Sequence, residues 1–422
     1  MPLRSWNRNR VAFSVKILAV WVLAAMATPV PVVAGIAFDQ DFDNGSLNID
    51  QTAVEDADSD QPIITLAFRD VMATGRWYHF DVRGVDGKQP LFRVPTQGGA
   101  DAAHRDTHRS VYSLDGGETY RYFDNGKRGD GYFTFEADEP FSQNRVRVAY
   151  SLPYPVSRTI DHARALSDSP WVTPVPSADA CFVIGLSPGT SGGGYRDELG
   201  REIPQLPLLG FRITDPAAGE DCKVNVVLTS GTHASESTGN HVLEGKIDFL
   251  VGDSPEAAEL RRRTVIHVYP QVNPEGRWAG YMRSAPQAPQ VNVNRDWTDE
   301  PRHSQVRTVS EAIVRDTGGR AAVLIDYHSH RSGYLEIWDG REDGEQRPYF
   351  TTLKKAHPRL IFLHWRVNGT VATWAEEQLD TVESFLVEIG FNAGWSIEDY
   401  HEYGADNARA LLAVIRHIQD GG

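Results

Sequence analysis

The residues of this chain that could do chemistry lie in four short segments. A histidine and a glutamate stand three positions apart in His233-Ala234-Ser235-Glu236, and further histidines end an apolar run in Asp326-Tyr327-His328-Ser329-His330. Asn294-Arg295 lies between these segments, and Glu388 ends a later apolar run. Two histidines and one carboxylate suit a zinc ion whose fourth position stays open for water, and another carboxylate can act as general base on that water. The set predicts a hydrolase with one zinc ion per chain.

The first pair, His233 and Glu236, follows the predicted strand Val224–Thr229 through a glycine. Open α/β sheets place their ligands at the carboxyl ends of strands. Residues three apart share one face of a helix, so both side chains can converge on a metal. The spacing is common by chance, and a second copy exists at His241 and Glu244. Because His241 lies about one turn into a predicted helix, we interpret the second copy as structural.

The third ligand comes from the segment that follows Ala321–Ile325. The period of two in a strand puts Asp326, His328 and His330 on one side and Tyr327 on the other. From the residues alone, either His328 or His330 can complete the site.

Glu388 and two arginines supply the remaining chemistry. A charge at the end of an apolar strand is costly unless it is paired or used, and burial raises its pKa toward the range of a general base. The structural alternative is a salt bridge from Glu388 to Arg283. Arg283 and Arg295 flank the loop Ser284–Val293. A planar guanidinium binds a carboxylate through two donors, and Asn294 can add a third.

Two regions must position these residues. From about Phe38 to Tyr154 apolar and polar residues alternate, which predicts an antiparallel β-sandwich over residues 35–156. After Ser157, continuous apolar runs separated by helical segments predict an α/β domain over residues 157–422, with a mixed, mostly parallel sheet flanked by helices. The predicted central strands and helices are Val224–Thr229, Thr264–Tyr269, Ala321–Tyr327 and Ser384–Val387, and Thr238–Val251, Ser304–Thr317 and Asp406–Gln419.

The N-terminus predicts an export signal over residues 1–34, because four basic residues precede the apolar run Ile17–Ala27 and small residues end at Ala34. We therefore expect cleavage near Ala34, or after Ala27, and an exported protein, periplasmic or secreted, with no stable membrane association after cleavage. The alternative is an uncleaved membrane anchor. Without this segment the formal net charge moves from −15 to −19, which disfavours nucleic-acid binding. In an oxidising compartment, Cys181 and Cys222 predict one disulfide.

In their order along the chain, these segments resemble the zinc carboxypeptidase family, the carboxypeptidase A-like peptidases. The family pattern of H-x-x-E, N-P-D-G, an arginine, D-x-N-R, a later histidine and a late glutamate is matched here. The matching residues are His233 and Glu236, Asn273-Pro274-Glu275-Gly276, Arg283, Asn292-Val293-Asn294-Arg295, His328 and Glu388. The closest likeness is to the cytosolic-carboxypeptidase-like branch, which carries D-L-H-G-H-S near the third ligand and has an N-terminal β-sandwich.

The resemblance implies His233, Glu236 and His328 as ligands of one zinc ion, and so selects His328 over His330. It implies Glu388 as the base that activates a zinc-bound water and Arg283 as the group that holds the oxyanion. Asn294 and Arg295 would bind the terminal carboxylate of the substrate. One departure is Asn292, which stands where the family has an aspartate that orients the first histidine.

We expect an exported zinc metallocarboxypeptidase that hydrolyses the C-terminal peptide bond of peptides or proteins. The first alternative is an amidase or carboxypeptidase that acts on cell-wall peptides with the same zinc site. The second is a binding module that keeps the fold without the chemistry, which only Asn292 favours.

Overall fold

The computed structural model describes residues 32–33, 35–69, 77–96, 108–129, 131–190, 195–330, 334–391 and 394–421. Residues Pro31–Gly422 form one compact unit. The predicted export signal, apart from residues 32–33, lies outside the described residues. None of the helices in the described ranges is long and apolar enough to cross a bilayer.

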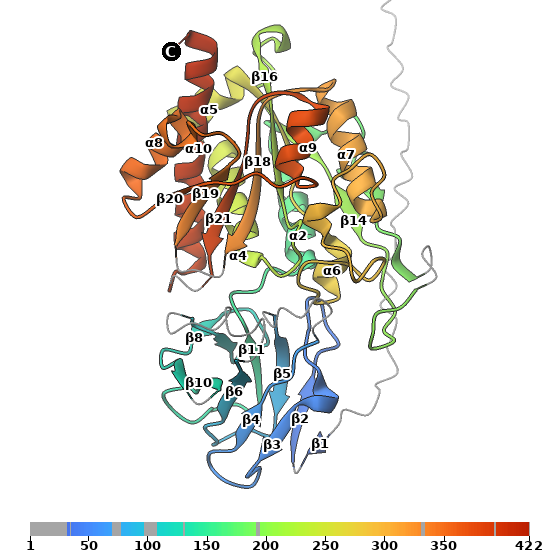
Figure 1. Ribbon diagram of the computed structural model, residues 1–422, viewed down its shortest axis with the longest axis vertical. Helices are drawn as coiled ribbons and strands as arrows, with labels where there is room; N and C mark the ends of the chain where they lie inside the picture. The colour runs from blue at the N-terminus through green and yellow to red at the C-terminus, as the bar shows by residue number, and fades with distance from the viewer. Residues whose placement is uncertain are drawn as a thin grey trace, which may run out of the picture. The chain divides into compact units, whose positions relative to one another are not determined.

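The N-terminal region contains two β-sheets (Figure 1). The first has the spatial order β1 (Val32–Val33), β2 (Ile36–Asp39), β5 (His79–Arg83), β11 (Arg145–Ala149), β7 (Val111–Ser113) and β8 (Arg121–Tyr122). The second has the order β3 (Ala53–Glu55), β4 (Ile63–Thr65), β6 (Leu91–Pro95), β10 (Tyr132–Phe135) and β9 (Lys127–Gly129). A 3₁₀ turn spans Ile49–Gln51.

The predicted β-sandwich is confirmed, with one difference in strand direction. Phe80 and Val82 of β5 and Val146 and Val148 of β11 are fully buried in its core, as the alternation predicted. The described strands of these sheets pair antiparallel except β4 and β6, which run parallel. The reason is topological, because β5 between them belongs to the other sheet, and the chain returns to the second sheet in its original direction.

The C-terminal region is built on an eight-stranded mixed sheet. Its spatial order is β12 (Val172–Pro174), β15 (Phe211–Ile213), β17 (Thr264–Tyr269), β16 (Val224–Ser230), β18 (Arg320–His330), β21 (Asp380–Gly390), β19 (Leu335–Asp339) and β20 (Ile361–His364). The four central strands, β17, β16, β18 and β21, are mutually parallel, and β15 and β19 pair antiparallel with the two outer strands of this group. A separate hairpin joins β13 (Val183–Leu186) and β14 (Pro207–Leu209).

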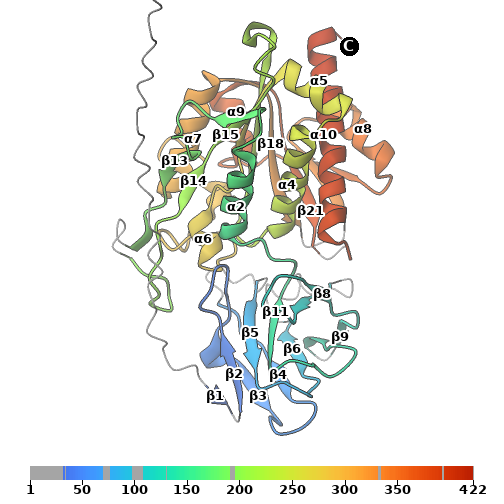
Figure 2. The same ribbon diagram turned by 180° about the vertical axis from the view of Figure 1, so that it is seen from behind.

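Helices cover both faces of this sheet, as the views from opposite sides show (Figures 1 and 2). The α-helices are α2 (Val156–Leu166), α4 (Ser237–Val251), α5 (Pro255–Arg263), α6 (Pro274–Trp278), α7 (Ser304–Thr317), α8 (Pro348–Ala356), α9 (Val371–Gln378) and α10 (Ile397–Asp420). Three 3₁₀ turns complete the described elements, at Glu220–Cys222, Val293–Arg295 and Gly344–Gln346.

Alternate residues of the central strands enter two different cores. Val323 and Ile325 of β18 pack in the core beneath α4 and α10, whereas Leu324 packs in the core beneath α7 and α9. Successive side chains of a strand point to opposite faces, so the same alternation separates Tyr327 from Asp326 and His328. The predicted division of this segment between two sides is confirmed. The predicted fold class, a mixed and mostly parallel sheet flanked by helices, is confirmed as well.

The two regions share apolar packing. Phe391, which directly follows β21, is buried in the core of the β-sandwich, with its ring centre 5.3 Å from that of Tyr150. Its backbone N–H donates to the carbonyl of His330 over 2.8 Å. The boundary between residues 35–156 and 157–422 stays a prediction.

The predicted disulfide is wrong for this structure. Cys181 and Cys222 are both exposed and both thiols are free.

Candidate active site

The first histidine and glutamate lie in the connection from β16 to α4. Gly231 follows the strand with φ of 68°, a left-handed conformation that glycine adopts without strain. The chain then turns so that Glu236 directly precedes the first residue of α4. The N–H of Ser235, between the two side chains, donates to the carbonyl of Met282 over 3.1 Å. His233 and Glu236 therefore lie at the carboxyl end of a central strand, as predicted.

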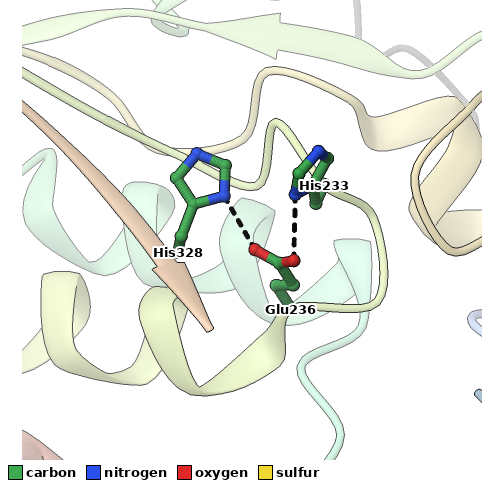
Figure 3. A group of neighbouring side chains, drawn as sticks. All are labelled: His233, Glu236 and His328. Atoms are coloured by element: carbon green, nitrogen blue, oxygen red, sulfur yellow. Dashed lines mark hydrogen bonds and ion pairs between the residues drawn. The ribbon is translucent and has the colours of Figure 1, made fainter. Parts of the chain in front are cut away.

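The three predicted metal ligands form one buried cluster (Figure 3). Nδ1 of His233 is 2.9 Å from Oε1 of Glu236, and Nδ1 of His328 is 2.7 Å from Oε2 of the same carboxylate. One ligand atom from each residue lies within 4.8 Å of the others. Two imidazole nitrogens and one carboxylate are the donor set of catalytic zinc sites that keep one position open.

The other ring nitrogen of each histidine has its own partner. Nε2–H of His233 donates to Oδ1 of Asn292 over 2.9 Å, and Nε2–H of His328 donates to Oδ2 of Asp326 over 2.5 Å. Asp326 is held in turn by the hydroxyl of Thr229, which donates to Oδ1 over 2.7 Å. These bonds place the proton on Nε2 and leave both Nδ1 lone pairs for a metal. The residues present therefore fit zinc.

His330, the other candidate for the third ligand, lies apart from the cluster. Its Nδ1 is 3.6 Å from Oε1 of Glu336, and its ring centre is 5.4 Å from that of Trp338. His328, rather than His330, is the histidine that meets Glu236.

Burial and charge shape the protonation of the ligands. Burial lowers the pKa of His233 to about 4, against the opposing charge of Glu236, so this imidazole is neutral at pH 7. Burial also acts to lower the pKa of His328, but Asp326 and Glu236 outweigh it and hold that pKa well above its ordinary value. A metal ligand must present a neutral imidazole, so metal binding competes with the protonated form of His328 that these two carboxylates favour.

Glu388 lies inside β21, in register with His328 of β18. Cross-strand neighbours in register lie side by side, so the carboxylate stands beside the metal cluster. Its Oε2 atom is buried and has no hydrogen-bond partner among the described residues. Burial raises the pKa of Glu388 to about 8, with a further rise from the charge of Glu236. The pKa shift that the sequence predicted for Glu388 is present.

Arg283 follows α6 and faces the ligands. Its Nη2 is 4.0 Å from Oε1 of Glu236, and its side chain is 28% exposed. Within the described ranges it forms no ion pair with Glu388, so the structural alternative for that glutamate is not supported. The positive charge of Arg283 lowers the pKa of Glu388, but the effect of burial, which raises it, is larger.

Asn294 and Arg295 lie in the 3₁₀ turn Val293–Arg295, where Asn294 is buried and Arg295 is exposed. Nδ2 of Asn294 is 3.2 Å from Nε2 of His328, and its Oδ1 accepts from the N–H of Val371 over 3.3 Å. Arg295 is exposed, with its guanidinium carbon 5.5 Å from the ring centre of Trp365. Although the residue is exposed, neighbouring atoms take some water from its guanidinium, and this desolvation and the charge of Arg283 lower the pKa of Arg295. Two guanidinium groups near each other offer a place for an anion.

The sequence analysis assigned no role to two aspartates that hold residues of the site in place. Asp296 directly follows Arg295, and its Oδ2 accepts from both the N–H and the Nδ1–H of His303, over 2.8 and 2.7 Å. This pair fixes the backbone that follows Arg295. Asp326 orients His328, and its place two residues before a strand-end histidine was a signal for that role.

Known proteins with a similar sequence or fold agree with this geometry. Residues 197–355 match the model of the zinc carboxypeptidase family. Cytosolic carboxypeptidase 6 of Mus musculus is 31% identical over 172 residues, which are 38% of this chain and 31% of the relative. Cytosolic carboxypeptidase 4 of Mus musculus is 25% identical over 242 residues, 55% of this chain and 20% of the relative. The chain thus spans less than a third of the length of these curated relatives.

Solved structures share the fold over most of this chain. A metallo-carboxypeptidase from Burkholderia cenocepacia superimposes with a TM-score of 0.73 at 18% identity, covering 91% of this chain and 99% of the other. A metallo-carboxypeptidase from Pseudomonas aeruginosa, in complex with (2-guanidinoethylmercapto)succinic acid, gives a TM-score of 0.69 at 18% identity, covering 90% and 99%. The family match confirms the resemblance for residues 197–355, which carry a zinc carboxypeptidase domain, and the solved structures agree in fold. Within this range, His233, Glu236 and His328 form a ligand set that fits zinc.

Proposed function

We propose that this chain is a zinc-dependent carboxypeptidase that removes residues from the C-termini of peptides or proteins. One observation carries the proposal. A buried carboxylate of raised pKa, Glu388, stands beside the His233–Glu236–His328 cluster, and its Oε2 has no hydrogen-bond partner among the residues that the structure describes. A catalytic base needs a pKa near the working pH and a free oxygen directed at the reacting water.

The chain's own residues divide the reaction among them. In this proposal Arg295 and Arg283 attract the terminal carboxylate of the substrate, and Arg283 also stabilises the negative charge that the peptide carbonyl gains. Zinc, when bound, supplies a Lewis acid for that carbonyl and for water. Glu388 accepts the proton of the attacking water and passes it to the leaving nitrogen. The peptide C–N bond breaks, leaving a new carboxylate and a free amine.

Glu388→Gln tests the proposal. The amide keeps the shape of the side chain but cannot accept the proton, so kcat should fall by about 10³-fold or more. Zinc content should stay at one ion per chain, because Glu388 is not a ligand. Activity is measured on a panel of L-peptides with free and amidated C-termini, together with cell-wall peptides.

Glu383→Gln is the matched control for this variant. Glu383 is a buried glutamate of the same strand, but Nη1 of Arg347 pairs with its Oε1 over 3.2 Å. Its variant should retain turnover. Full activity of Glu388→Gln would contradict the mechanism, and equal cleavage of free and amidated peptides would contradict the carboxypeptidase assignment. Cleavage of cell-wall peptides alone would establish the alternative substrate.

We also propose that the chain is exported, on the strength of the basic and apolar pattern in residues 1–34. This would set it apart from relatives that are named cytosolic carboxypeptidases. N-terminal sequencing of the chain expressed in full in a bacterium, after cell fractionation, tests the proposal. A mature N-terminus beyond Ala34 in the exported fraction supports it, and an intact N-terminus in the cytosol contradicts it.

A further inference from the structure

The segment Arg277–Met282 leads directly into Arg283, and β-sandwich residues bind its backbone. The side-chain amide of Asn44 donates to the carbonyl of Arg277 over 2.9 Å, and the N–H of Asn44 donates to the carbonyl of Trp278 over 2.9 Å. Nη1 of Arg69 donates to the carbonyl of Ala279 over 2.8 Å. Helix α6 ends at Trp278. The β-sandwich donors add to partners from the C-terminal region, because the carbonyl of Arg277 also accepts from the N–H of Gly280 over 3.1 Å and that of Ala279 from Nη2 of Arg201 over 2.8 Å.

The β-sandwich contacts the segment Arg277–Met282 at two further residues, Gly280 and Met282. Gly280 has φ of 71°, and a Cβ atom at this position would lie 2.4 Å from the carbonyl oxygen of Gly45. Only glycine allows the two backbones to approach so closely. The side chain of Met282 packs against the β-sandwich core. The β-sandwich therefore touches the segment from its first residue to its last.

The opposite side of the same segment faces the ligand cluster. The carbonyl of Met282 accepts from the N–H of Ser235, which lies between the first two ligands. The carbonyl of Arg283 accepts from the N–H of Val293 over 2.9 Å. The backbone at Arg283 is thus held from two sides, by Ser235 in the loop of the first two ligands and by Val293 in the turn that contains Arg295.

The two β-sandwich donors are themselves held in place. Asn44 is fully buried and has φ of 72°, a left-handed conformation that asparagine tolerates better than most residues. The side chain of Arg69 is 2% exposed, and its Nη2 lies 3.1 Å from Asp197 and 2.6 Å from Glu198. Donors fixed in this way can define the position of the backbone that they bind.

We propose that Asn44 and Arg69 are positioning residues for Arg283, so that the β-sandwich sets where this guanidinium meets the developing oxyanion. The inference rests on the proposed function. The side chain of Arg283 is partly exposed and has no ion pair shorter than 4.0 Å among the described residues, so its backbone largely determines its place. Small displacements of a group that acts in the transition state lower kcat more than they change KM.

Asn44→Gly is the first test, because glycine keeps the left-handed backbone while the buried side chain and its donor are removed. We expect kcat to fall by about 10-fold, KM to change less than about 2-fold, and zinc content to stay the same. Asn125→Gly is the matched control, because Asn125 accepts only from the N–H of Glu136 within the β-sandwich in the described structure, and it should leave kcat unchanged. Arg69→Lys keeps the positive charge beside Asp197 and tests the second donor.

A double variant separates positioning from a general structural effect. In an Arg283→Ala background, Asn44→Gly should cause no further loss of kcat, because its effect passes through Arg283. A full additional 10-fold loss would overturn the inference, and so would native kcat in both Asn44→Gly and Arg69→Lys.

Hydrogen exchange supplies a readout that does not depend on activity. The N–H of Tyr281 donates to the carbonyl of Gly276 over 2.9 Å, and its exchange should be faster in Asn44→Gly than in the native chain. Unchanged exchange in this segment overturns the inference. A native chain that cleaves no peptide overturns the proposed function instead, and the exchange result still decides the positioning role.

Discussion

Two copies of the same motif stand eight residues apart, the first just before α4 and the second within it, and only the first forms a metal cluster. His233 and Glu236 precede the helix, and the carboxylate of Glu236 meets two imidazole nitrogens. His241 and Glu244 lie inside the helix, equally buried. The carboxylate of Glu244 accepts hydrogen bonds from Tyr154 and Arg158, which lie outside this helix.

The partners of Glu244 explain the difference. Arg158 donates to Oε1 over 2.6 Å and to Oε2 over 3.0 Å, and the hydroxyl of Tyr154 donates to Oε2 over 2.6 Å. Nε2 of His401 lies 3.2 Å from Oε1, while Nε2 of His241 is 3.2 Å from the carbonyl of Pro153. A metal at this copy would have to displace an arginine. The spacing makes a site possible, and the neighbouring elements decide whether the carboxylate is free.

The largest expected contrast between the two copies is in zinc binding. His233→Gln removes a ligand and should weaken zinc binding by about 10³-fold or more, whereas His241→Gln should bind zinc like the native chain. Elemental analysis after dialysis, followed by competition with a chelator, measures both. Zinc loss in His241→Gln, or retention in His233→Gln, would reverse the assignment of the two copies.

The second contrast is in stability and its dependence on pH. Burial raises the pKa of Glu244, but the hydrogen bonds from His401 and Arg158 outweigh it and hold the pKa well below the ordinary value of 4.5. The ion-pair stabilisation is therefore complete above pH 4.5 and is lost as the pH falls below it. Glu244→Gln should lower the free energy of unfolding at pH 7 by about 3 kcal/mol and flatten this acid dependence.

Urea unfolding of the metal-free chain between pH 3 and 7 measures this effect. Glu236→Gln is the control from the other copy, and it should lose zinc while destabilising the metal-free chain less than Glu244→Gln. Equal stability of Glu244→Gln and the native chain would show that the second copy is not a structural anchor.

The smallest contrast lies within the metal cluster itself. His328 donates to a carboxylate, Asp326, whereas His233 donates to the neutral amide of Asn292. A carboxylate partner makes a ligand histidine more basic, so Asn292→Asp should tighten zinc binding by about 10-fold. Asp326→Asn should weaken it by a similar factor. Chelator competition at fixed pH measures both, and an unchanged affinity in Asn292→Asp would mean that orientation alone matters at this histidine.

The central elements were predictable because they depend on local apolar pattern. The predicted strand Thr264–Tyr269 matches β17 in full, and the predicted helix Ser304–Thr317 matches α7. Ends were less predictable. The predicted strand Ser384–Val387 runs over Asp380–Gly390, because pairing with β18 continues through polar residues, so Glu388 lies within the strand and not after it.

The start of α10 was missed for a different reason. It begins at Ile397, nine residues before the predicted start at Asp406. Ser396 and Asp399 form a capping box that marks this start, and the apolar periodicity alone did not reveal it.

The ligand set was predictable from motif order, but its long-range partners were not. Asp197 and Ala279 meet Arg69 from positions more than a hundred residues away, and no periodicity encodes such a contact. The number of cysteines does not show how far apart they lie in the fold. The predicted pairing of Cys181 with Cys222 was wrong for this reason.

Phe391 joins the two regions of the chain, although the sequence pattern suggests two separate domains. This ring stands three residues after Glu388 along the chain, yet it completes the hydrophobic core of the β-sandwich. A fragment starting at residue 157 would expose the ring and lose the β-sandwich donors to the carbonyls of Arg277, Trp278 and Ala279. The β-sandwich is therefore not a detachable module, and any exchange of it between related chains must carry the surface that receives Phe391.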